Sequence, residues 1–158
     1  MLSAGISKMG KTSLYFIERG VKIDSDCYQE LLDLMLSECY EIDGGKFIFQ
    51  QDGARSHTSA STIEYLDDHD VNFEYIPPNK WPANSPDLNP CDNSLWNDLE
   101  QALHRRNRLF ETVEEMKTHL AEVWDALPQE HSNNAIDAFR QKCKLVIQAE
   151  GRHIEHYR

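Results

Sequence analysis

The sequence predicts an α/β fold in which helices pack on a sheet. Helix-like and strand-like patterns alternate through the first part of the 158 residues, and such alternation is typical of sheets covered by helices. One strand-like segment, residues 46–51, is strongly apolar and is followed directly by a lone acid. The remainder of the chain shows only helical periodicity, which predicts a group of C-terminal helices after the sheet.

The composition indicates a single globular domain. Hydrophobic residues make up 40% and charged residues 27% of the chain, which is ordinary for such a domain, and the length suits one core. We expect a sheet and active-site part over residues 1–100 and the C-terminal helices over 101–158. No apolar run approaches the ~20 residues that span a bilayer, so we expect no membrane partner. The four cysteines lack zinc-binding spacing, which favours reduced thiols in an intracellular protein.

The net charge is −11, from 16 Lys and Arg against 27 Asp and Glu. This balance argues against a free-standing nucleic-acid-binding domain, which usually carries a basic face. It does not exclude an enzyme core that gathers acids around metal ions while another segment binds phosphates. The most basic stretch, residues 104–108, is expected to be the cationic end of a helix.

The first elements follow from short apolar stretches and one helical period. Two apolar stretches flank residues 8–11 and predict a hairpin. A helix follows, with Ser25 or Asp26 as its N-terminal cap, and Gly44 breaks the chain after it. Residues 46–51 are too apolar on both faces to lie at a solvated edge, so they predict a buried strand.

A second helix and strand come next and lead into a proline-rich loop. Apolar residues over 60–66 recur at helical spacing, and residues 71–77 alternate as a strand should. Five of the six prolines then fall within residues 77–90. Because proline removes backbone donors and disfavours helix in the preceding residue, this segment is predicted to be a stiff, irregular loop.

Three helices are predicted after the loop. The first begins near Asp92. The second starts with a capping box formed by Thr112 and Glu115 and ends at Pro128. The last runs from about Ser132. Its apolar residues are expected to face inward: Ile136, Phe139, Cys143, Val146 and Ile147.

Two carboxylates mark a candidate metal site. Asp52 follows the predicted strand, and ligands of open α/β sheets gather at the carboxyl ends of strands. Asp92 shares a predicted helix face with Trp96 and Leu99, so we expect its side chain to face the sheet. Carboxylate oxygens suit Mg²⁺ or Mn²⁺. A pair of such ions can activate a water or a 3′-hydroxyl and stabilise the leaving oxygen of a phosphodiester.

The residue pattern also allows a purely structural role for both acids. An acid in the first turn of a helix often serves as a cap or as a partner of the helix dipole. An acid that precedes glycine, as Asp52 does, is often a turn residue. The pattern by itself leaves these alternatives open.

Three segments carry a resemblance to a known family: "FQQDGARSHTS", "WPANSPDLNPCDNSLW" and "AEGRHIEHYR". They resemble the second half of the catalytic domain of mariner-type transposases, which belong to the Tc/mariner superfamily of cut-and-paste DNA transposases. In that family, the acid of a QDGAxxH segment is the second of three catalytic carboxylates. The last acid of an SPDLNPxD segment is the third. These two positions correspond to Asp52 and Asp92.

The resemblance implies an RNase H-like core, a mixed sheet with helices on it, followed by C-terminal helices. It implies metal-dependent DNA strand cleavage and strand transfer, with Asp52 and Asp92 as catalytic residues and as ligands of Mg²⁺ or Mn²⁺ in a two-metal site. The implied partners are transposon ends and target DNA, with a homodimer in the full-length protein and the nucleus as its location. His57 and Asn89 are candidates for a DNA contact or for support of the metal ligands. The alternatives are packing beneath the site for His57 and a turn hydrogen bond for Asn89.

The chain departs from the family pattern at its start. The family's first catalytic acid lies on the first strand of the sheet, upstream of the segment with which this chain opens, and no acid precedes Glu18. We therefore expect the first strand and the first carboxylate to be missing, and the chain to be inactive alone. The alternative to a transposase catalytic domain is a catalytically dead, transposon-derived remnant or a co-opted interaction module.

Overall fold

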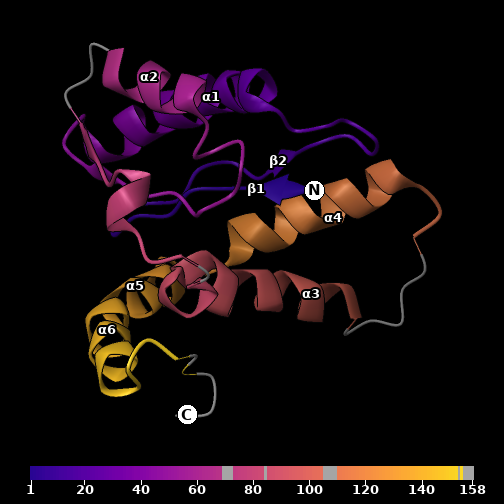
Figure 1. Ribbon diagram of the computed structural model, residues 1–158. Coiled ribbons are helices and arrows are strands. Elements are labelled where there is room, and N and C mark those ends of the chain that lie inside the picture. The colour runs from indigo at the N-terminus through magenta and orange to yellow at the C-terminus, as the bar shows by residue number, and fades with distance from the viewer. Residues whose placement is uncertain (69–72, 84, 105–109, 153, 155–158) are drawn as a thin grey trace. The chain divides into compact units, whose positions relative to one another are not determined.

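A computed structural model describes residues 1–68, 73–83, 85–104, 110–152 and 154 (Figure 1). The chain divides into two compact units. The first comprises Met1–Gly5 and Met9–Asn84, and the second comprises Ile6–Lys8 and Ser85–Arg158. The expected single domain, with its sheet part over residues 1–100, stays a prediction. None of the described helices is both long and apolar enough to cross a membrane.

The first unit begins with the predicted hairpin. Strands β1 (Leu2–Ser3) and β2 (Tyr15–Phe16) pair antiparallel. Between them, the Thr12 N–H donates to the Gly5 carbonyl at 2.9 Å, which extends the pairing toward the turn. The hairpin predicted around residues 8–11 is therefore confirmed.

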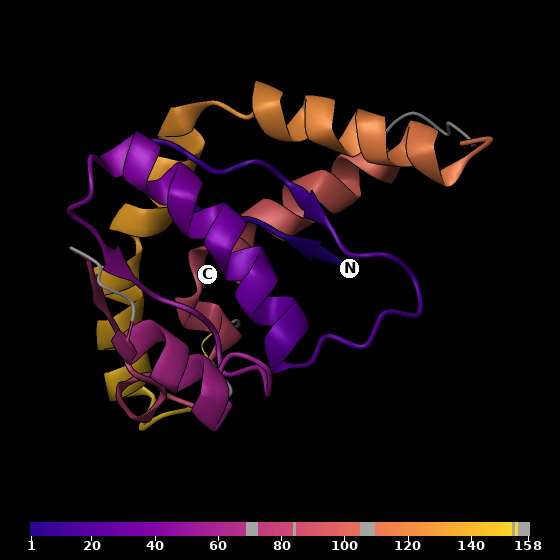
Figure 2. The same cartoon turned by 90° about the horizontal axis from the view of Figure 1, so that it is seen from above.

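A parallel pair of short strands forms the second sheet of this unit. Strands β3 (Ile48–Phe49) and β4 (Glu74–Tyr75) pair in parallel, and helix α2 (Ala60–Asp68) lies between them in the chain. Parallel strands need such a crossover because a tight turn cannot join them. Seen from above, helix α1 (Ser25–Asp43) runs diagonally between this pair and the hairpin (Figure 2).

The core of the first unit forms around the buried face of α1. Its buried residues recur at helical spacing, as the sequence predicts. Leu66 of α2 and Phe73 join this cluster, and the rings of Phe47 and Phe73 stack with their centroids 5.0 Å apart. The buried α1 residues are Tyr28, Leu32, Met35 and Leu36.

One part of the strand prediction is wrong. Phe47 and Phe49 pack against the core cluster, but Ile48 is 64% exposed. Successive side chains of a strand point to opposite faces, and the core cluster covers only the face that holds the two phenylalanines. The apolar run therefore does not mark a strand that is buried on both faces.

The N-terminal cap of α1 also differs from the prediction. Asp24, not Ser25 or Asp26, accepts a hydrogen bond from the Cys27 N–H at 3.2 Å. Asp24 is the last residue with an extended backbone (φ −88°, ψ −174°), and a cap residue needs that conformation to reach the free N–H groups of the first turn. At the other end, Gly44 has φ 65° and closes the helix as predicted.

Replacing Asp24 with alanine is therefore expected to lower the free energy of unfolding by about 1 kcal/mol, the usual effect of losing such a cap. Asp24→Asn should retain most of the stability, because asparagine caps equally well. Urea denaturation followed by circular dichroism measures both. A larger loss in Ser25→Ala than in Asp24→Ala would show that the cap lies where the sequence pattern suggested.

The second unit is helical. Its core residues include Leu95, Leu99, Leu120 and Trp124, each at most 3% exposed. A short 3₁₀ turn and then a short π turn precede the α-helices. In chain order its elements are η2 (Pro86–Leu88), η3 (Cys91–Leu95), α3 (Trp96–His104), α4 (Val113–Ala126), α5 (Gln129–Asp137) and α6 (Phe139–Gln148).

The predicted capping box begins α4. The Thr112 hydroxyl accepts a hydrogen bond from the Glu115 N–H at 3.1 Å, and the Glu115 carboxylate accepts one from the Glu111 N–H at 3.0 Å. The first bond satisfies an N–H group of the first turn, and the second reaches the residue before the cap and not the Thr112 N–H. The predicted end before Pro128 is also confirmed.

The last helix, which was predicted to be continuous, is interrupted and forms two helices. Helix α5 starts directly after Pro128, earlier than the predicted Ser132, because proline's fixed φ (here −61°) suits the residue before a helix. The chain then breaks at Ala138 between α5 and α6. A break changes the direction in which later side chains point, so the single inward stripe is wrong: no residue of α6 is buried, and Ile147 is 76% exposed.

Candidate active site

Asp52 lies at the surface of the first unit, just beyond β3. Its Oδ1 accepts a hydrogen bond from the Ala54 N–H at 2.9 Å, and His57 Nδ1 lies 2.6 Å from the same oxygen. The hydrogen bond from His57, opposed by partial burial and aided by the Ala54 N–H, lowers the pKa of Asp52. The carboxylate is therefore ionised at neutral pH. Its side chain is 44% exposed, so it remains open to a ligand from solvent.

A buried network beneath Asp52 holds His57 in place. The Tyr28 ring of α1 stacks on the His57 ring with centroids 3.9 Å apart. The Tyr28 hydroxyl donates to Gln51 Oε1 at 2.7 Å, and Gln51 Nε2 donates to the His57 carbonyl at 3.0 Å. Burial and the negative charge of Asp52 raise the pKa of Tyr28, so the phenol stays a neutral donor. The His57 ring thus packs on Tyr28, which is the alternative that the sequence left open, and it also contacts Asp52. A DNA contact by His57 stays a prediction.

Sequence reasoning missed the roles of Tyr28 and Gln51. Tyr28 is recognisable from the sequence only as a core position of α1, because nothing local connects it to Asp52. Gln51 offers one signal: it is a polar residue at the end of an apolar strand, directly before the acid. A buried amide needs hydrogen-bond partners, and Tyr28 and the His57 backbone supply them.

Asp92 lies in the π-helical turn η3 and is exposed. Its Oδ1 accepts a hydrogen bond from Trp96 Nε1 at 3.1 Å. The expectation that the Asp92 side chain is turned away from solvent is wrong. A π turn places one more residue in each turn than an α-helix does, so the α-helical spacing that put Asp92 on the stripe of Leu99 does not hold. Leu95 and Leu99 take the buried side instead.

The turn before Asp92 is shaped by its own side chains. Asn89 Oδ1 accepts a hydrogen bond from the Cys91 N–H at 3.1 Å, which is the turn contact that the sequence offered as the alternative for Asn89. Asp87 Oδ2 accepts a hydrogen bond from the Ile154 N–H at 3.1 Å.

Burial, aided by the charge of Asp92, raises the pKa of the Cys91 thiol to about 12, so this thiol is not a nucleophile at neutral pH.

A histidine of α5 contacts residues of the π turn and of α3 in the second unit. His131 Nε2 lies 3.1 Å from the Ser94 hydroxyl and 2.6 Å from Asp98 Oδ2. Both contacts use one ring nitrogen, whereas a catalytic serine–histidine–acid triad uses the two nitrogens for different partners. This cluster therefore positions the segment that carries Asp92 and is not a catalytic triad.

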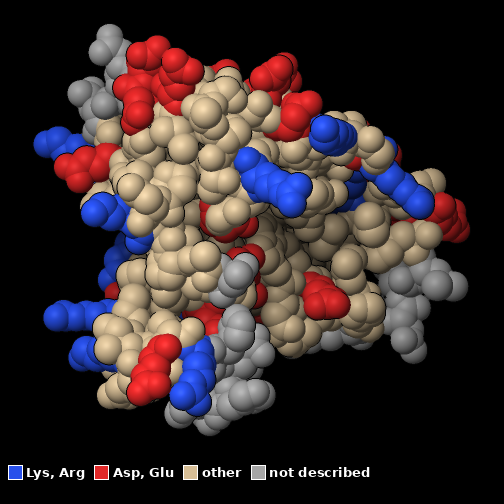
Figure 3. Space-filling view, viewed as in Figure 1, with Lys and Arg blue, Asp and Glu red and all other residues tan. Residues whose placement is uncertain are grey.

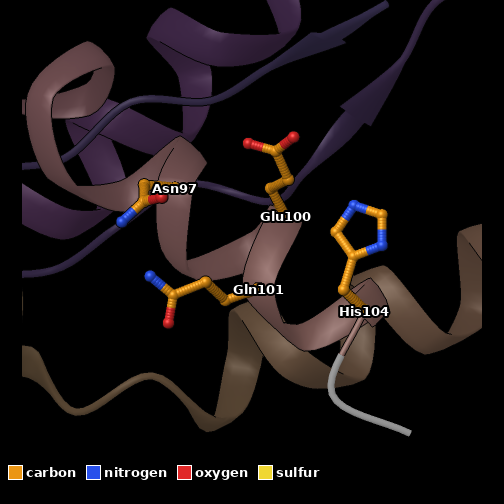
Figure 4. Close-up of a pocket in the computed structure, with 4 residues that line it drawn as sticks. All are labelled: Asn97, Glu100, Gln101 and His104. Atoms are coloured by element: carbon orange, nitrogen blue, oxygen red, sulfur yellow. The ribbon is translucent and has the colours of Figure 1, made fainter. Parts of the chain in front are cut away.

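A separate hollow of about 380 Å³ lies along α3 in the second unit. Four polar side chains of that helix line it, and neither candidate acid is among them. We assign it no part in the site. The lining residues are Asn97, Glu100, Gln101 and His104 (Figure 4).

The predicted site residues thus fall into two groups. Asp52 and His57 are in contact in the first unit, while Asp92 and Asn89 lie on one turn of the second. Within the residues that the structure describes, no three His, Cys, Asp or Glu side chains come together as a potential metal site.

Comparison of the sequence with protein families and curated proteins identifies its relatives. The family of DDE superfamily endonucleases matches residues 6–117, a range that includes both candidate acids. The Tc3 transposase of Caenorhabditis elegans is 29% identical over 157 residues, which cover 99% of this chain and 45% of that protein. The Tcb2 transposase of Caenorhabditis briggsae is 30% identical over 130 residues, covering 82% of this chain and 45% of that protein. The chain therefore spans less than half the length of these relatives.

Solved structures show the same fold. The crystal structure of the catalytic domain of Mos1 mariner transposase matches with a TM-score of 0.80 at 24% identity, over 98% of this chain and 75% of that one. The Mos1 mariner paired-end complex with Mn matches with a TM-score of 0.84 at 23% identity, over 98% and 44%. The predicted α/β, RNase H-like fold class is confirmed.

The family match extends over most of the chain, and the matched relatives are transposases. The resemblance predicted from the motifs around Asp52 and Asp92 is therefore confirmed: the chain resembles the catalytic domain of a Tc1/mariner cut-and-paste transposase, and it belongs to the DDE superfamily endonucleases.

Proposed function

We propose that this chain is the catalytic part of a cut-and-paste DNA transposase in which Asp52 and Asp92 bind divalent metal ions and direct DNA strand cleavage and strand transfer. The observation that carries the proposal is the setting of Asp52. Its carboxylate is ionised and partly exposed, and it is contacted through Oδ1 by Ala54 and His57, at the end of a strand in a DDE-family fold. Structures of the Mos1 catalytic domain with Mn and with Mg support a divalent ion as the cofactor.

The two carboxylates fit Mg²⁺ or Mn²⁺. Both are exposed enough to bind an ion that keeps waters and phosphate oxygens as its other ligands. Two such ions, held by Asp52 and Asp92, would lower the pKa of an attacking water and stabilise the leaving oxygen of the phosphodiester. His57 and the Ala54 N–H hold Asp52 through Oδ1, which fixes the direction of Oδ2. The hydrogen bond from Trp96 Nε1 holds the Asp92 carboxylate in a similar way, through Oδ1.

We propose DNA as the partner, both as transposon ends and as target. Mos1 structures that this chain resembles include a paired-end complex with the left transposon end and a strand transfer complex. From the same relationship we propose a homodimer for the whole protein and the nucleus as the place where it meets its substrate.

Substituting Asp52 or Asp92 with asparagine is expected to weaken Mn²⁺ binding at least tenfold. Loss of a group that merely orients a metal ligand already costs about 10–100-fold in affinity, and here a ligand itself is lost. Electron paramagnetic resonance of free Mn²⁺ during titration of the 158-residue chain measures the affinity. Asp68→Asn and Glu122→Gln are matched controls, because they remove the same charge from exposed positions on α2 and α4.

Unchanged Mn²⁺ affinity in Asp52→Asn and Asp92→Asn would refute the metal assignment. Absence of any Mn²⁺ site in the parent chain would favour the catalytically dead remnant. Any Mn²⁺-dependent nicking of plasmid DNA by the chain should disappear in both variants and persist in both controls. Nicking that survives either substitution would contradict the proposed catalytic role.

A further inference from the structure

Helix α6 carries three cations and no acid: Arg140, Lys142 and Lys144. This is unusual in a chain whose net charge is −11. Figure 3 shows several blue side chains, with red ones among them, at the lower left, where Figure 1 draws α5 and α6. The positive charge of α6 is therefore a local feature that opposes the overall balance.

The acids that flank α6 in the chain are already paired. Asp137, before the helix, forms an ion pair with Lys8. Glu150, after it, lies 3.4 Å from Arg152 Nη2. These contacts offset the two negative charges that flank α6 in the chain.

The exposed residues of α6 lie on one face. Their spacing is that of neighbouring positions on a helix surface, and the face combines two cations with two amides and one apolar side chain. No residue of the helix is buried. The exposed residues are Arg140, Gln141, Lys144, Ile147 and Gln148.

Within the second unit, α6 lies next to the short turn that precedes the Asp92 segment in the chain. It packs against η2, the turn shortly before Asp92 in the chain. The Ile154 N–H, just after α6, donates to Asp87 in that same turn. Packing and this hydrogen bond together place α6 beside the turn that leads to the candidate catalytic acid.

We propose that this face of α6, formed by Arg140, Gln141, Lys144, Ile147 and Gln148, binds the sugar–phosphate backbone of duplex DNA beside Asp92. The inference rests on the proposed function, since it takes DNA as the substrate. Phosphate oxygens accept hydrogen bonds from Arg, Lys and Gln side chains, and such contacts set the position of a protein on DNA without reading sequence. A chain that is acidic overall repels DNA, so a surface with cations and no acids is where a duplex can approach.

The test is DNA binding by the 158-residue chain and by Arg140→Gln/Lys144→Gln, measured by fluorescence anisotropy of a labelled duplex over a range of salt concentrations. Each phosphate contact contributes about 0.9 to the slope of log K against log salt concentration. We therefore expect the slope of the double variant to be smaller by about 1.8 than that of the parent chain. The loss of affinity should be the same for duplexes of different sequence.

The matched control is Arg19→Gln/Lys22→Gln. It removes one Arg and one Lys from exposed positions between β2 and α1 in the first unit, so the change in net charge is identical. We expect its salt slope to stay at the parent value. Equal slopes and affinities for the two double variants would overturn the proposal, because net charge alone would then explain the binding.

Two further outcomes would also overturn it. One is that the parent chain binds duplex DNA but Arg140→Gln/Lys144→Gln does not change the slope of log K against log salt concentration. DNA would then bind at another surface. The other is no duplex binding by the parent chain. In either case the Mn²⁺ titration of the parent chain and of its Asp52→Asn and Asp92→Asn variants tests the proposed function independently.

A different result would point to another partner. If the chain self-associates as its concentration rises, and Ile147→Ser abolishes this association without changing DNA binding, the face is a protein contact instead.

Discussion

Replacing Tyr28 with alanine is expected to lower the free energy of unfolding by about 3–5 kcal/mol, the range for truncating a buried aromatic side chain. Tyr28 is 4% exposed and belongs to the core cluster with Leu32 and Leu66. The substitution removes the ring that stacks on His57 and the hydroxyl that binds Gln51. It therefore creates a cavity and leaves a buried amide oxygen without its donor.

Tyr28→Phe separates these two contributions. It keeps the ring and removes only the hydroxyl, so the expected loss is about 1–3 kcal/mol for the unsatisfied Gln51 oxygen. Tyr65→Phe is the matched control, because it removes a hydroxyl that donates to Asp33 at the surface, where water can replace it. Urea denaturation followed by circular dichroism gives all three values. An equal loss in the two Phe variants would contradict the assigned network.

Local patterns predicted the parts of the fold that depend on local chemistry. The hairpin and the buried stripe of α1 follow from apolar spacing. The Thr112 capping box and the ends at Gly44 and Pro128 follow from residues whose backbone preferences act at their own position. In each case the physical cause lies within a few residues of the element it controls.

The sequence could not choose between alternatives that differ only in backbone geometry. Asp24, Ser25 and Asp26 can all cap a helix, and the extended backbone of Asp24 decides between them. The π turn at Cys91–Leu95 depends on main-chain hydrogen bonds that no spacing of side chains specifies. That turn is why Asp92 is exposed although its spacing from Leu99 suggested a buried face.

In the candidate site, too, features with a local cause were predictable and features that depend on distant residues were not. Both acids could be proposed from the sequence because their motifs are local, and the family match covers the range that contains them. Their support could not, because it comes from residues distant in the chain: Tyr28 reaches Asp52 through His57, and Trp124 reaches Asp92 through Trp96. In both units, one buried aromatic side chain stacks on a ring that contacts the acid.

Trp124 is the larger of these two buried aromatics, and Trp124→Ala is expected to cost about 3–5 kcal/mol of unfolding free energy. Its side chain is 1% exposed and stacks on Trp96 with ring centroids 6.2 Å apart. The cavity would lie between α4 and the start of α3, two elements of the same unit that pack together.

Trp96→Phe is the control for this substitution. It keeps a ring against Trp124 and removes the Nε1 donor to Asp92, which lies at the surface. Since water can satisfy that carboxylate, the expected loss is only about 0.5–1.5 kcal/mol, the net value of an ordinary hydrogen bond. Urea denaturation again provides the measurement. If Trp124→Ala were no more destabilising than Trp96→Phe, Trp124 would not be the support of the Asp92 turn, and the pairing of each acid with a buried aromatic would hold for Asp52 alone.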